Sequence, residues 1–214
     1  MKMLRYYLMR HGETTWNAKD VFQGKQDTPL SEKGLLQAKL TASLASRIGK
    51  ARIWCSPLKR ALQTAELLAE RGGYEILTEK GLMEIDHGKW ERLHVEEVKR
   101  LYPESFEMWH KEPDKVVMPD GESLRDVQER ALRVLTKIRE SGEEQAIIMT
   151  HDAVIKCLLC HWLELPLSKY WSFKFSNCSV SIVEEDDKGK AVILLLDDVC
   201  HLEQGWTWPE QKSV

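Results

Sequence analysis

The chain of 214 residues lacks any long uninterrupted apolar run. A helix that crosses a membrane needs roughly 20 mostly apolar residues, so we expect no membrane partner. Charges and tyrosines also interrupt the start of the chain, where Lys2 and Arg5 leave no apolar core for a secretory signal. These absences predict a cytoplasmic protein.

An excess of positive charge is missing as well. The 31 Lys and Arg residues are outnumbered by 34 Asp and Glu residues, which gives a formal net charge of −3. Proteins that bind a polyanion through bulk charge are basic, so we expect no nucleic-acid partner. A single phosphate group needs only a local cluster of cations, and a phosphate site is therefore compatible with this composition.

Cysteine is scarce, and its five positions suggest no disulfide framework, because the number is odd and no secretory signal is visible. The segment Cys157-Leu-Leu-Cys160-His161 has the form of a covalent haem site, but it lies in an apolar run that is more typical of a core helix. A zinc site would need a second pair of ligands, and the chain has no other C-x-x-C pattern. We expect two buried core cysteines, no metal and no cofactor.

Apolar runs of strand length alternate with segments of helical periodicity along most of the chain. This alternation predicts a single α/β domain over residues 1–214, with a mostly parallel central sheet between two layers of helices. Two β-like segments around a turn at 187–189 predict a hairpin that supplies an antiparallel edge strand. The expected strands are 4–9, 52–55, 74–77, 146–150, 179–184 and 191–196, and the expected helices begin at residues 32, 58, 124 and 153.

Local signals predict where these helices start and which face is buried. Ser31 and Ser123 are the expected N-caps, with Asp126 completing a capping box for the second of them. Pro57 is expected to mark the start of the helix that follows it, from Leu58 to Glu70. The helix after Ser31 is expected to end at Gly49. Its predicted inner stripe is Leu36, Leu40, Leu44 and Ile48, and that of the helix after Ser123 is Val127, Ala131, Val134, Leu135 and Ile138.

Two segments do not follow the α/β alternation. Residues 92–119 mix a short helix with prolines and many charges, which predicts a small helical insertion that roofs a site. The C-terminal tail 197–214 contains Trp206 and Trp208 but no clear element. No pattern in either segment predicts an oligomeric state.

Basic side chains follow three of the predicted strands. Arg10 and His11 come directly after the first strand, Arg60 lies one helical turn beyond the second, and His151 follows the strand 146–150. Ligands of parallel α/β sheets bind beyond the carboxyl ends of the strands. If these strands are neighbours, two guanidiniums and two imidazoles meet in one crevice.

Such a crevice has the groups that phosphoryl transfer needs. A guanidinium offers a planar set of donors that matches phosphate oxygens. A neutral imidazole is a competent nucleophile near neutral pH. The Arg10–His11 pair therefore predicts a place to hold a phosphate beside a group that can attack it.

The sequence around these residues resembles the histidine phosphatase superfamily, also called phosphoglycerate mutase-like. The resemblance covers residues 4–184 and comprises five motifs in matching order. These are Arg10-His11-Gly12-Glu13-Thr14 with Trp16-Asn17, Gln23-Gly24 and Asp27-Thr28-Pro29-Leu30; Ser56 to Ala65 around Arg60; Glu84 before Ile85-Asp86-His87-Gly88-Lys89-Trp90; Asp120-Gly121-Glu122-Ser123; and Thr150-His151.

The resemblance implies a role for each matching position. His11 would be the nucleophile that forms a phosphohistidine, and Arg10, Arg60 and His151 would surround the phosphoryl oxygens. Glu84 would protonate the leaving oxygen and then activate water, which requires a raised pKa from burial or from a nearby carboxylate. His151 is expected to be protonated with substrate bound, and His11 to be neutral at the attacking nitrogen. Asn17 and Gln23 are the expected substrate-binding residues.

The chain departs from the family pattern at two places. Many relatives carry Glu-Gly where this chain has Glu91-Arg92, and many phosphatases carry His-Gly-Gly where it has His151-Asp152-Ala153. Neither departure falls on the five catalytic positions. Both are expected to reshape the pocket, so the substrate does not carry over from the family.

Three functions are compatible with the resemblance. We favour a phosphatase acting on a small phosphorylated metabolite, with α-ribazole phosphate as one candidate substrate. A cofactor-dependent phosphoglycerate mutase is the alternative, and an inactive relative that binds phosphorylated ligands is a third. The phosphatase is favoured because the short segment 92–118 is rich in acids that would repel a bisphosphorylated substrate. These acids are Glu96, Glu97, Glu104, Glu107, Glu112 and Asp114.

Overall fold

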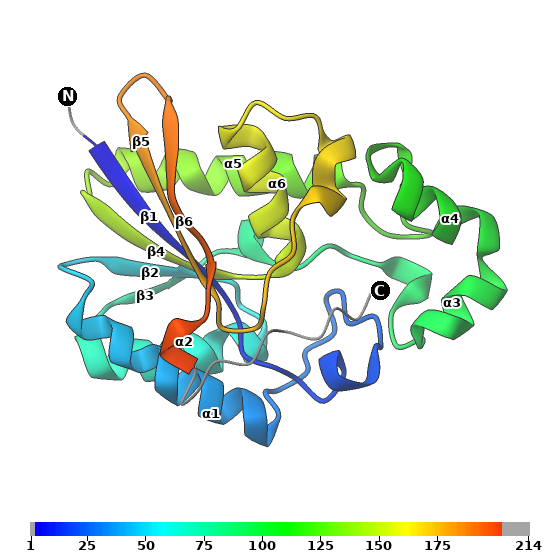
Figure 1. Ribbon diagram of the computed structural model, residues 1–214, viewed down its shortest axis with the longest axis horizontal. Coiled ribbons are helices and arrows are strands. Elements are labelled where there is room, and N and C mark those ends of the chain that lie inside the picture. The colour runs from blue at the N-terminus through cyan, green and yellow to red at the C-terminus, as the bar shows by residue number, and fades with distance from the viewer. Residues whose placement is uncertain (1–2, 203–214) are drawn as a thin grey trace.

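The structure is a computed structural model, and it describes residues 3–202. Within that range the chain alternates strands and helices as predicted (Figure 1). The strands are β1 (Met3–Arg10), β2 (Arg52–Cys55), β3 (Ile76–Thr78), β4 (Gln145–Thr150), β5 (Val180–Asp186) and β6 (Ala191–Asp198). The α-helices are α1 (Glu32–Thr41), α2 (Lys59–Gly72), α3 (Val95–Leu101), α4 (Pro103–Lys111), α5 (Leu124–Glu140) and α6 (Asp152–Trp162).

The six strands form one sheet in the order β3-β2-β4-β1-β5-β6. The pairs β3–β2, β2–β4 and β4–β1 are parallel, whereas β5 runs antiparallel to both β1 and β6. The predicted fold class is confirmed, including the hairpin at the sheet edge. Because β4 pairs with both β1 and β2, the carboxyl ends of these three strands are adjacent.

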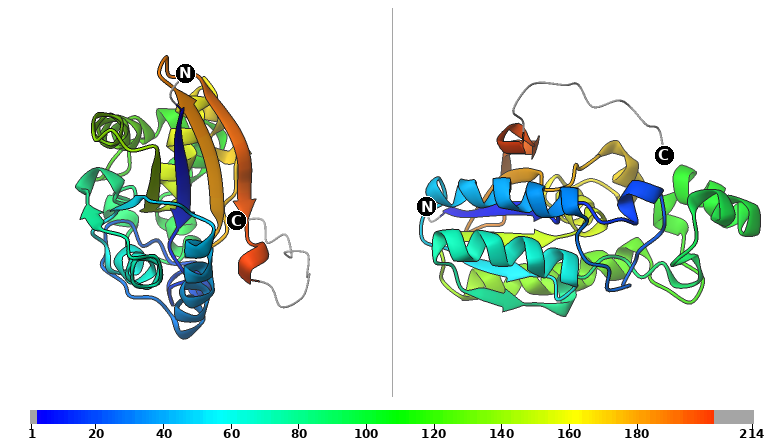
Figure 2. Two further views of the ribbon diagram at one scale, coloured as in Figure 1. Left: turned by 90° about the vertical axis from the view of Figure 1, so that its left-hand side faces the viewer. Right: turned by 90° about the horizontal axis from the view of Figure 1, so that it is seen from below.

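Side chains alternate across the sheet and build a core on each face. On β1, Tyr6 and Leu8 pack with the inner stripe of α5 and with α6, and Tyr7 and Met9 pack with Ala65 and other residues of α2. Figures 1 and 2 show α1 and α2 on one side of the sheet and α5 and α6 on the other. Helices α3 and α4 lie beyond one end of the sheet.

The helix α5 matches its sequence signals closely. Ser123 caps it, Asp126 completes the capping box, and all five residues of the predicted stripe are buried. This agreement is expected where a cap and a regular apolar stripe point to the same helix.

The prediction for α1 holds at its cap and at the buried Ile48, but it was wrong about the end of the helix and about Leu36. Ser31 caps the helix as expected, but the α-helix ends at Thr41, short 3-10 turns follow, and Leu36 is 58% exposed. The buried face is instead made of small residues, including Gly34 and Ala38. Their size allows the helix backbone to approach the loop that follows β1, and large leucines at these positions would prevent that approach.

The start of α2 also differs from the prediction. The first helical residue is Lys59, and Leu58 is its extended N-cap, so Pro57 precedes the helix. The reason is that Ser56 continues the strand pairing, because its backbone N–H donates to the carbonyl of Met149 over 3.0 Å. The helix cannot begin until the chain has left the sheet.

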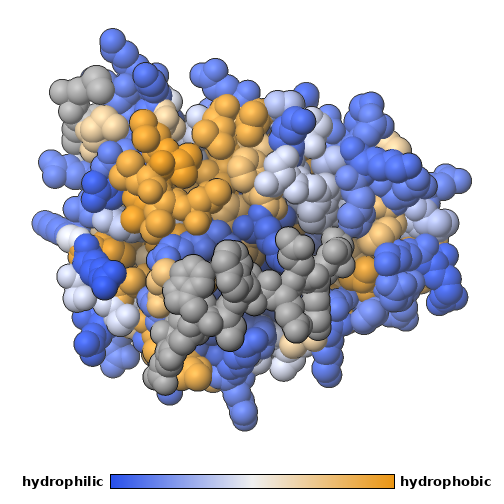
Figure 3. Space-filling model, in the orientation of Figure 1, coloured by the Kyte–Doolittle hydropathy of each residue, from blue (hydrophilic) through white to orange (hydrophobic). Residues whose placement is uncertain are grey.

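The two irregular segments contain more structure than the sequence indicated. Residues 92–119 hold two α-helices, α3 and α4, where one short helix was expected. Strand β6 extends to Asp198, and a short 3-10 turn ends at Leu202. Trp206 and Trp208 lie outside the described residues. Apolar side chains gather over the β5–β6 hairpin in Figure 3, where Val192, Leu194 and Leu196 of β6 are exposed.

Both cysteines of the C-x-x-C-H segment are buried on α6, as expected of core residues, whereas His161 is exposed. No helix within residues 3–202 has the length and apolar character to cross a bilayer. Nor does this part of the chain contain a group of three His, Cys, Asp or Glu side chains arranged to hold a metal ion.

Replacing Gly34 with alanine is expected to destabilise the fold, although alanine is normally the better helix former. A Cβ at this position would lie 2.0 Å from the carbonyl oxygen of Glu13, so α1 would have to move away from that loop. We expect the free energy of unfolding in urea to fall by about 1–3 kcal/mol. The matched control is Leu36→Ala on the same helix, which should change it by less than about 0.5 kcal/mol. Equal stability of the two variants would contradict this packing.

Candidate active site

A cavity of about 390 Å³ opens at the carboxyl ends of β1, β2 and β4. Arg10, His11, Arg60 and Glu84 all line it. His151 lies just behind His11, fully buried, with the two ring centroids 5.0 Å apart. The structure thus brings together the two guanidiniums, the two imidazoles and the carboxyl group that were singled out in the sequence.

The hydrogen bonds of His11 determine which of its ring nitrogens carries the proton. Nδ1 lies 2.7 Å from the carbonyl oxygen of Gly12, and a carbonyl can only accept, so Nδ1 carries the proton. Nε2 accepts from Nε of Arg60 over 3.3 Å. Burial, followed by the charges of Arg60 and Arg10, holds the pKa of His11 well below its ordinary value of 6.5. The ring is therefore neutral near pH 7 and carries its lone pair on Nε2.

The guanidinium of Arg60 is held by backbone carbonyls. It projects from the first turn of α2 and donates to Gly24 and Gln26, each over 2.8 Å. Burial lowers its pKa to about 10, so it stays cationic at neutral pH. Arg10 donates through Nη1 to the carbonyl of Phe175, whereas its Nε is buried and has no partner among the described residues. That Nε–H is available to an anion.

His151 also has a side-chain nitrogen without a hydrogen-bond partner among the described residues. Its Nε2 lies 2.7 Å from Oγ of Ser56, and its Nδ1 is buried without a partner in the described part of the chain. Burial, and then Arg60, hold the pKa of His151 well below 6.5. A phosphate dianion placed among these groups would oppose both effects and raise that pKa. Protonation of His151 in the substrate complex stays a prediction.

Glu84 has the raised pKa that an acid at this position requires. Its Oε1 accepts from the backbone N–H of Ile85 over 3.0 Å and from that of Ala153, at the start of α6, over 3.2 Å. Burial raises the pKa of Glu84 above its ordinary 4.5, and the neighbouring carboxylate of Asp152 raises it further. The sequence left open whether burial or a carboxylate would do this, and both contribute.

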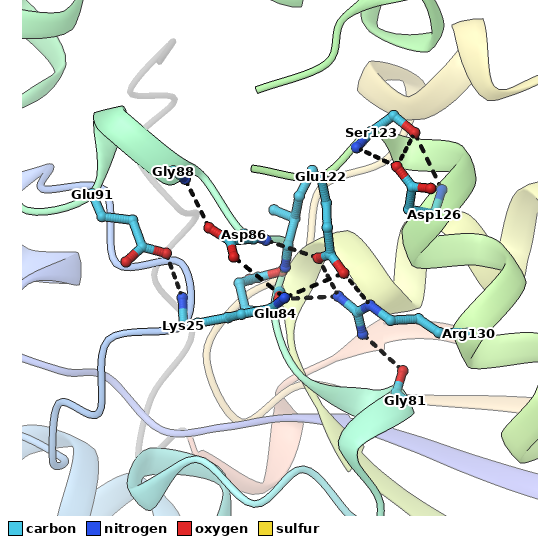
Figure 4. A network of polar contacts seen from close by, with 11 residues as sticks. Lys25, Gly81, Glu84, Asp86, Gly88, Glu91, Glu122, Ser123, Asp126 and Arg130 are labelled. Atoms are coloured by element: carbon cyan, nitrogen blue, oxygen red, sulfur yellow. Dashed lines mark hydrogen bonds and ion pairs between the residues drawn. The ribbon is translucent and has the colours of Figure 1, made fainter. Parts of the chain in front are cut away.

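An ion-pair network holds the loop that carries Glu84 (Figure 4). Arg130 of α5 donates to the carbonyls of Gly81 and Glu84 over 2.8 and 3.0 Å and pairs with Glu122. Lys25, in the loop that holds Arg60, lies 3.3 Å from carboxylates of both Asp86 and Glu122. The network ties the Glu84 loop to the loop that holds Arg60.

Asn17 and Gln23 line the cavity, but their carboxamide oxygens are engaged within the loop. Oδ1 of Asn17 accepts from the backbone N–H of Thr14 over 3.0 Å, and Oε1 of Gln23 accepts from the hydroxyl of Thr28 over 2.6 Å. Oγ1 of Thr14 lies 3.0 Å from Oδ1 of Asn17 and 2.9 Å from Oε1 of Gln23, and its single proton is donated to one of these two oxygens. Both residues therefore shape the loop, and substrate binding by them stays a prediction.

The segment 92–119 covers the cavity as predicted, but its lining is not acidic. Its contributions to the wall are Val95, Phe106, Trp109 and His110. The acids point outward, and three of them pair with exposed lysines. An acidic roof was the reason to favour a phosphatase over a mutase, and that reason was wrong, because a helix over a cavity turns its apolar face inward. None of the six acids named from the sequence lines this cavity.

The two departures from the family pattern have different consequences. Arg92 adopts a φ of 71°, a conformation that glycine takes freely, and its guanidinium binds Gln26 outside the cavity wall. Asp152 does line the cavity. Only the second departure reshapes the pocket.

Sequence reasoning missed several lining or supporting residues. Ser56 bonds to His151, and the half-buried His87, whose pKa falls to about 4 through loss of solvent, forms part of the cavity wall. Lys156 of α6 also lines it. Its spacing of four residues from Asp152 was visible in the sequence, but the direction in which α6 faces was not.

The α/β sheet and its cationic cavity define an enzyme of phosphate-ester chemistry. More specifically, the chain belongs to the histidine phosphatase superfamily, because residues 6–198 match the model of its branch 1. It is 40% identical to phosphoserine phosphatase 1 of Hydrogenobacter thermophilus, over 94% of this chain and 95% of that protein. It is 33% identical to a probable phosphoglycerate mutase GpmB of Cronobacter sakazakii, over 94% and 96% of the two chains. The solved structure of Bacillus stearothermophilus YhfR is 34% identical and superposes with a TM-score of 0.88, over 94% of this chain and all 100% of that one.

Replacing Asp152 with asparagine is expected to lower the pKa of the Glu84 carboxyl, because it removes a negative charge that favours the protonated form. The measurement is a carboxyl ¹³C NMR titration of protein labelled in its glutamates, with Glu84→Gln assigning the resonance. The control Asp187→Asn, in the exposed hairpin turn, should leave that pKa in place. An unchanged or higher pKa in the Asp152 variant would show that this carboxylate does not act on Glu84.

Proposed function

We propose that the chain hydrolyses phosphate monoesters of small metabolites in the cytoplasm, through a phosphohistidine on His11. The observation that supports this best is the position of His11, whose unprotonated Nε2 lies beside the guanidinium of Arg60. The proposal treats residues 1–214 as one domain, with 92–119 inserted over the cavity.

In the first step, Nε2 of His11 attacks phosphorus while the bond from phosphorus to the ester oxygen breaks. Arg10, Arg60 and His151 hold the three non-bridging oxygens, with the unpaired Nε–H of Arg10 as one donor. The departing alkoxide takes the proton of Glu84, whose raised pKa favours the protonated form. The products are the alcohol and a phosphohistidine.

In the second step, water attacks the phosphohistidine and the bond from nitrogen to phosphorus breaks. The carboxylate of Glu84 now accepts a proton from that water, which returns Glu84 to its starting state. Inorganic phosphate leaves, and His11 is again neutral. Fixed cations supply the charge stabilisation in both steps, so we propose that no metal is required.

One relative supports a phosphorylated amino acid as substrate. The relative at 40% identity is named a phosphoserine phosphatase, so we propose phosphoserine before the α-ribazole phosphate suggested by the sequence. The likeness to probable phosphoglycerate mutases keeps the mutase as the second candidate. An inactive, ligand-binding relative is disfavoured because all five chemical groups are present and converge.

Replacing His11 with alanine is expected to abolish labelling of the protein by a ³²P-phosphate ester and to reduce turnover by at least 10³-fold, in line with loss of an essential nucleophile. Wild type quenched in alkaline detergent, in which the bond between nitrogen and phosphorus survives, should carry label on histidine. The control His161→Ala, on the exposed end of α6, should label and turn over like wild type. Normal turnover by the His11 variant would contradict the mechanism.

The same labelled reaction separates the two candidate activities. A phosphatase releases the label as inorganic phosphate, whereas a mutase given 3-phosphoglycerate and a bisphosphoglycerate primer returns it in 2-phosphoglycerate. We expect inorganic phosphate as the main product. Label recovered mainly in 2-phosphoglycerate would favour the mutase.

A further inference from the structure

An ion pair between a buried lysine and a half-buried aspartate lines the cavity beyond the phosphate-binding groups. Asp152 and Lys156, both on α6, line the cavity, and their Oδ2 and Nζ atoms are 2.8 Å apart. Lys156 is only 3% exposed. Lysine is rarely buried without a function or a strong partner, so a lysine at a cavity wall calls for an explanation.

Asp152 lies next to the phosphate-binding groups, and Lys156 lies further from them. Asp152 follows His151 in the chain, and Lys156 is one helical turn further along the same face of α6. The ammonium of Lys156 lies 4.6 Å from the ring centroids of both Tyr170 and Trp171, which form part of the cavity wall. A substrate whose phosphate occupies the crevice would therefore place its alcohol part near this pair.

Neither charge is fully used by the other. An ammonium has three N–H donors and a carboxylate has several acceptor sites, so one contact between them leaves capacity on both. The remaining acid and lysine that line the cavity, Asp20 and Lys174, are exposed at its mouth. Asp152 and Lys156 are thus the charged residues inside the cavity that can contact the alcohol part of the substrate.

We propose that Asp152 and Lys156 select phosphate esters whose alcohol part carries both an ammonium and a carboxylate, as in a phosphorylated hydroxy amino acid. Lys156 binds the carboxylate and Asp152 binds the ammonium. A substrate with a carboxylate alone gains the first contact but meets the negative charge of Asp152, and a second phosphate is repelled more strongly. This inference rests on the proposed phosphatase activity and adds its substrate class.

Three primary phosphate esters separate the two contacts. Phosphoserine has both groups, phosphoethanolamine has only the ammonium, and 3-phosphoglycerate has only the carboxylate. All three esters release a primary alkoxide that Glu84 protonates. A variant that changes this chemical step therefore changes all three kcat/KM values alike, and the ratios between substrates report the contacts to the alcohol part. Wild type should prefer phosphoserine to each of the others by roughly 10- to 100-fold, the range of one charge-assisted hydrogen bond. Ratios near one would overturn the proposal.

Variants assign each preference to its residue. Lys156→Met should reduce the preference of phosphoserine over phosphoethanolamine to about one, with Lys156→Arg restoring much of it. Asp152→Asn should reduce the preference over 3-phosphoglycerate, whatever its effect on overall rate through Glu84. If both variants keep the wild-type ratios, the pair only neutralises itself and the proposal is wrong.

Phenyl phosphate, which has neither charged group, separates this test from that of the proposed function. Lys156→Met should still hydrolyse it, because phenyl phosphate makes neither of the two contacts, and a far-UV circular dichroism spectrum like that of wild type shows separately that the variant is folded. If that variant does not fold, Lys156→Arg and Asp152→Asn decide the assignment. Failure of wild type to hydrolyse phenyl phosphate or any of the three esters would instead refute the phosphatase activity itself.

Discussion

The hydrogen bond from Nδ1 of His11 to the carbonyl of Gly12 determines the chemistry that the site can perform. It leaves the lone pair on Nε2, where Arg60 also reaches. The bond depends on how the chain leaves β1, because the N–H of Gly12 is in turn held by Thr64 of α2. Gly12 also packs against the backbone of Gly34 in α1, so both helices on this face support the nucleophile.

The cavity shifts the pKa values of the acid and of the nucleophile in opposite directions. Burial, and then the charges of Arg60 and Arg10, lower the pKa of both histidines, while burial and Asp152 raise that of Glu84. Each group is thus shifted toward its neutral form, in which an imidazole can attack and a carboxyl group can donate a proton. A phosphate brings negative charge into this arrangement and compensates the cations. The network of Lys25, Glu122 and Arg130 keeps the acid loop in position.

Features encoded in adjacent residues could be predicted from the sequence. Helix α5 and the convergence of His11 with His151 followed from a cap, apolar runs and the general behaviour of parallel sheets. Features that depend on distant contacts could not be predicted. The buried face of α1 is set by backbone contact between Gly34 and Glu13, and the outward direction of the acids of 92–119 is set by how α3 and α4 pack. The orientation of Lys156 likewise depends on the rotation of α6 against the sheet.

The most direct test of this account is the tautomer of His11, measured by ¹⁵N NMR of protein labelled in its histidines. Near pH 7 we predict a neutral ring with the proton on Nδ1 and none on Nε2, and an assignment secured by loss of those resonances in a His11 variant. A proton on Nε2, or a doubly protonated ring at that pH, would leave no lone pair on Nε2 for attack on phosphorus and would contradict the central claim.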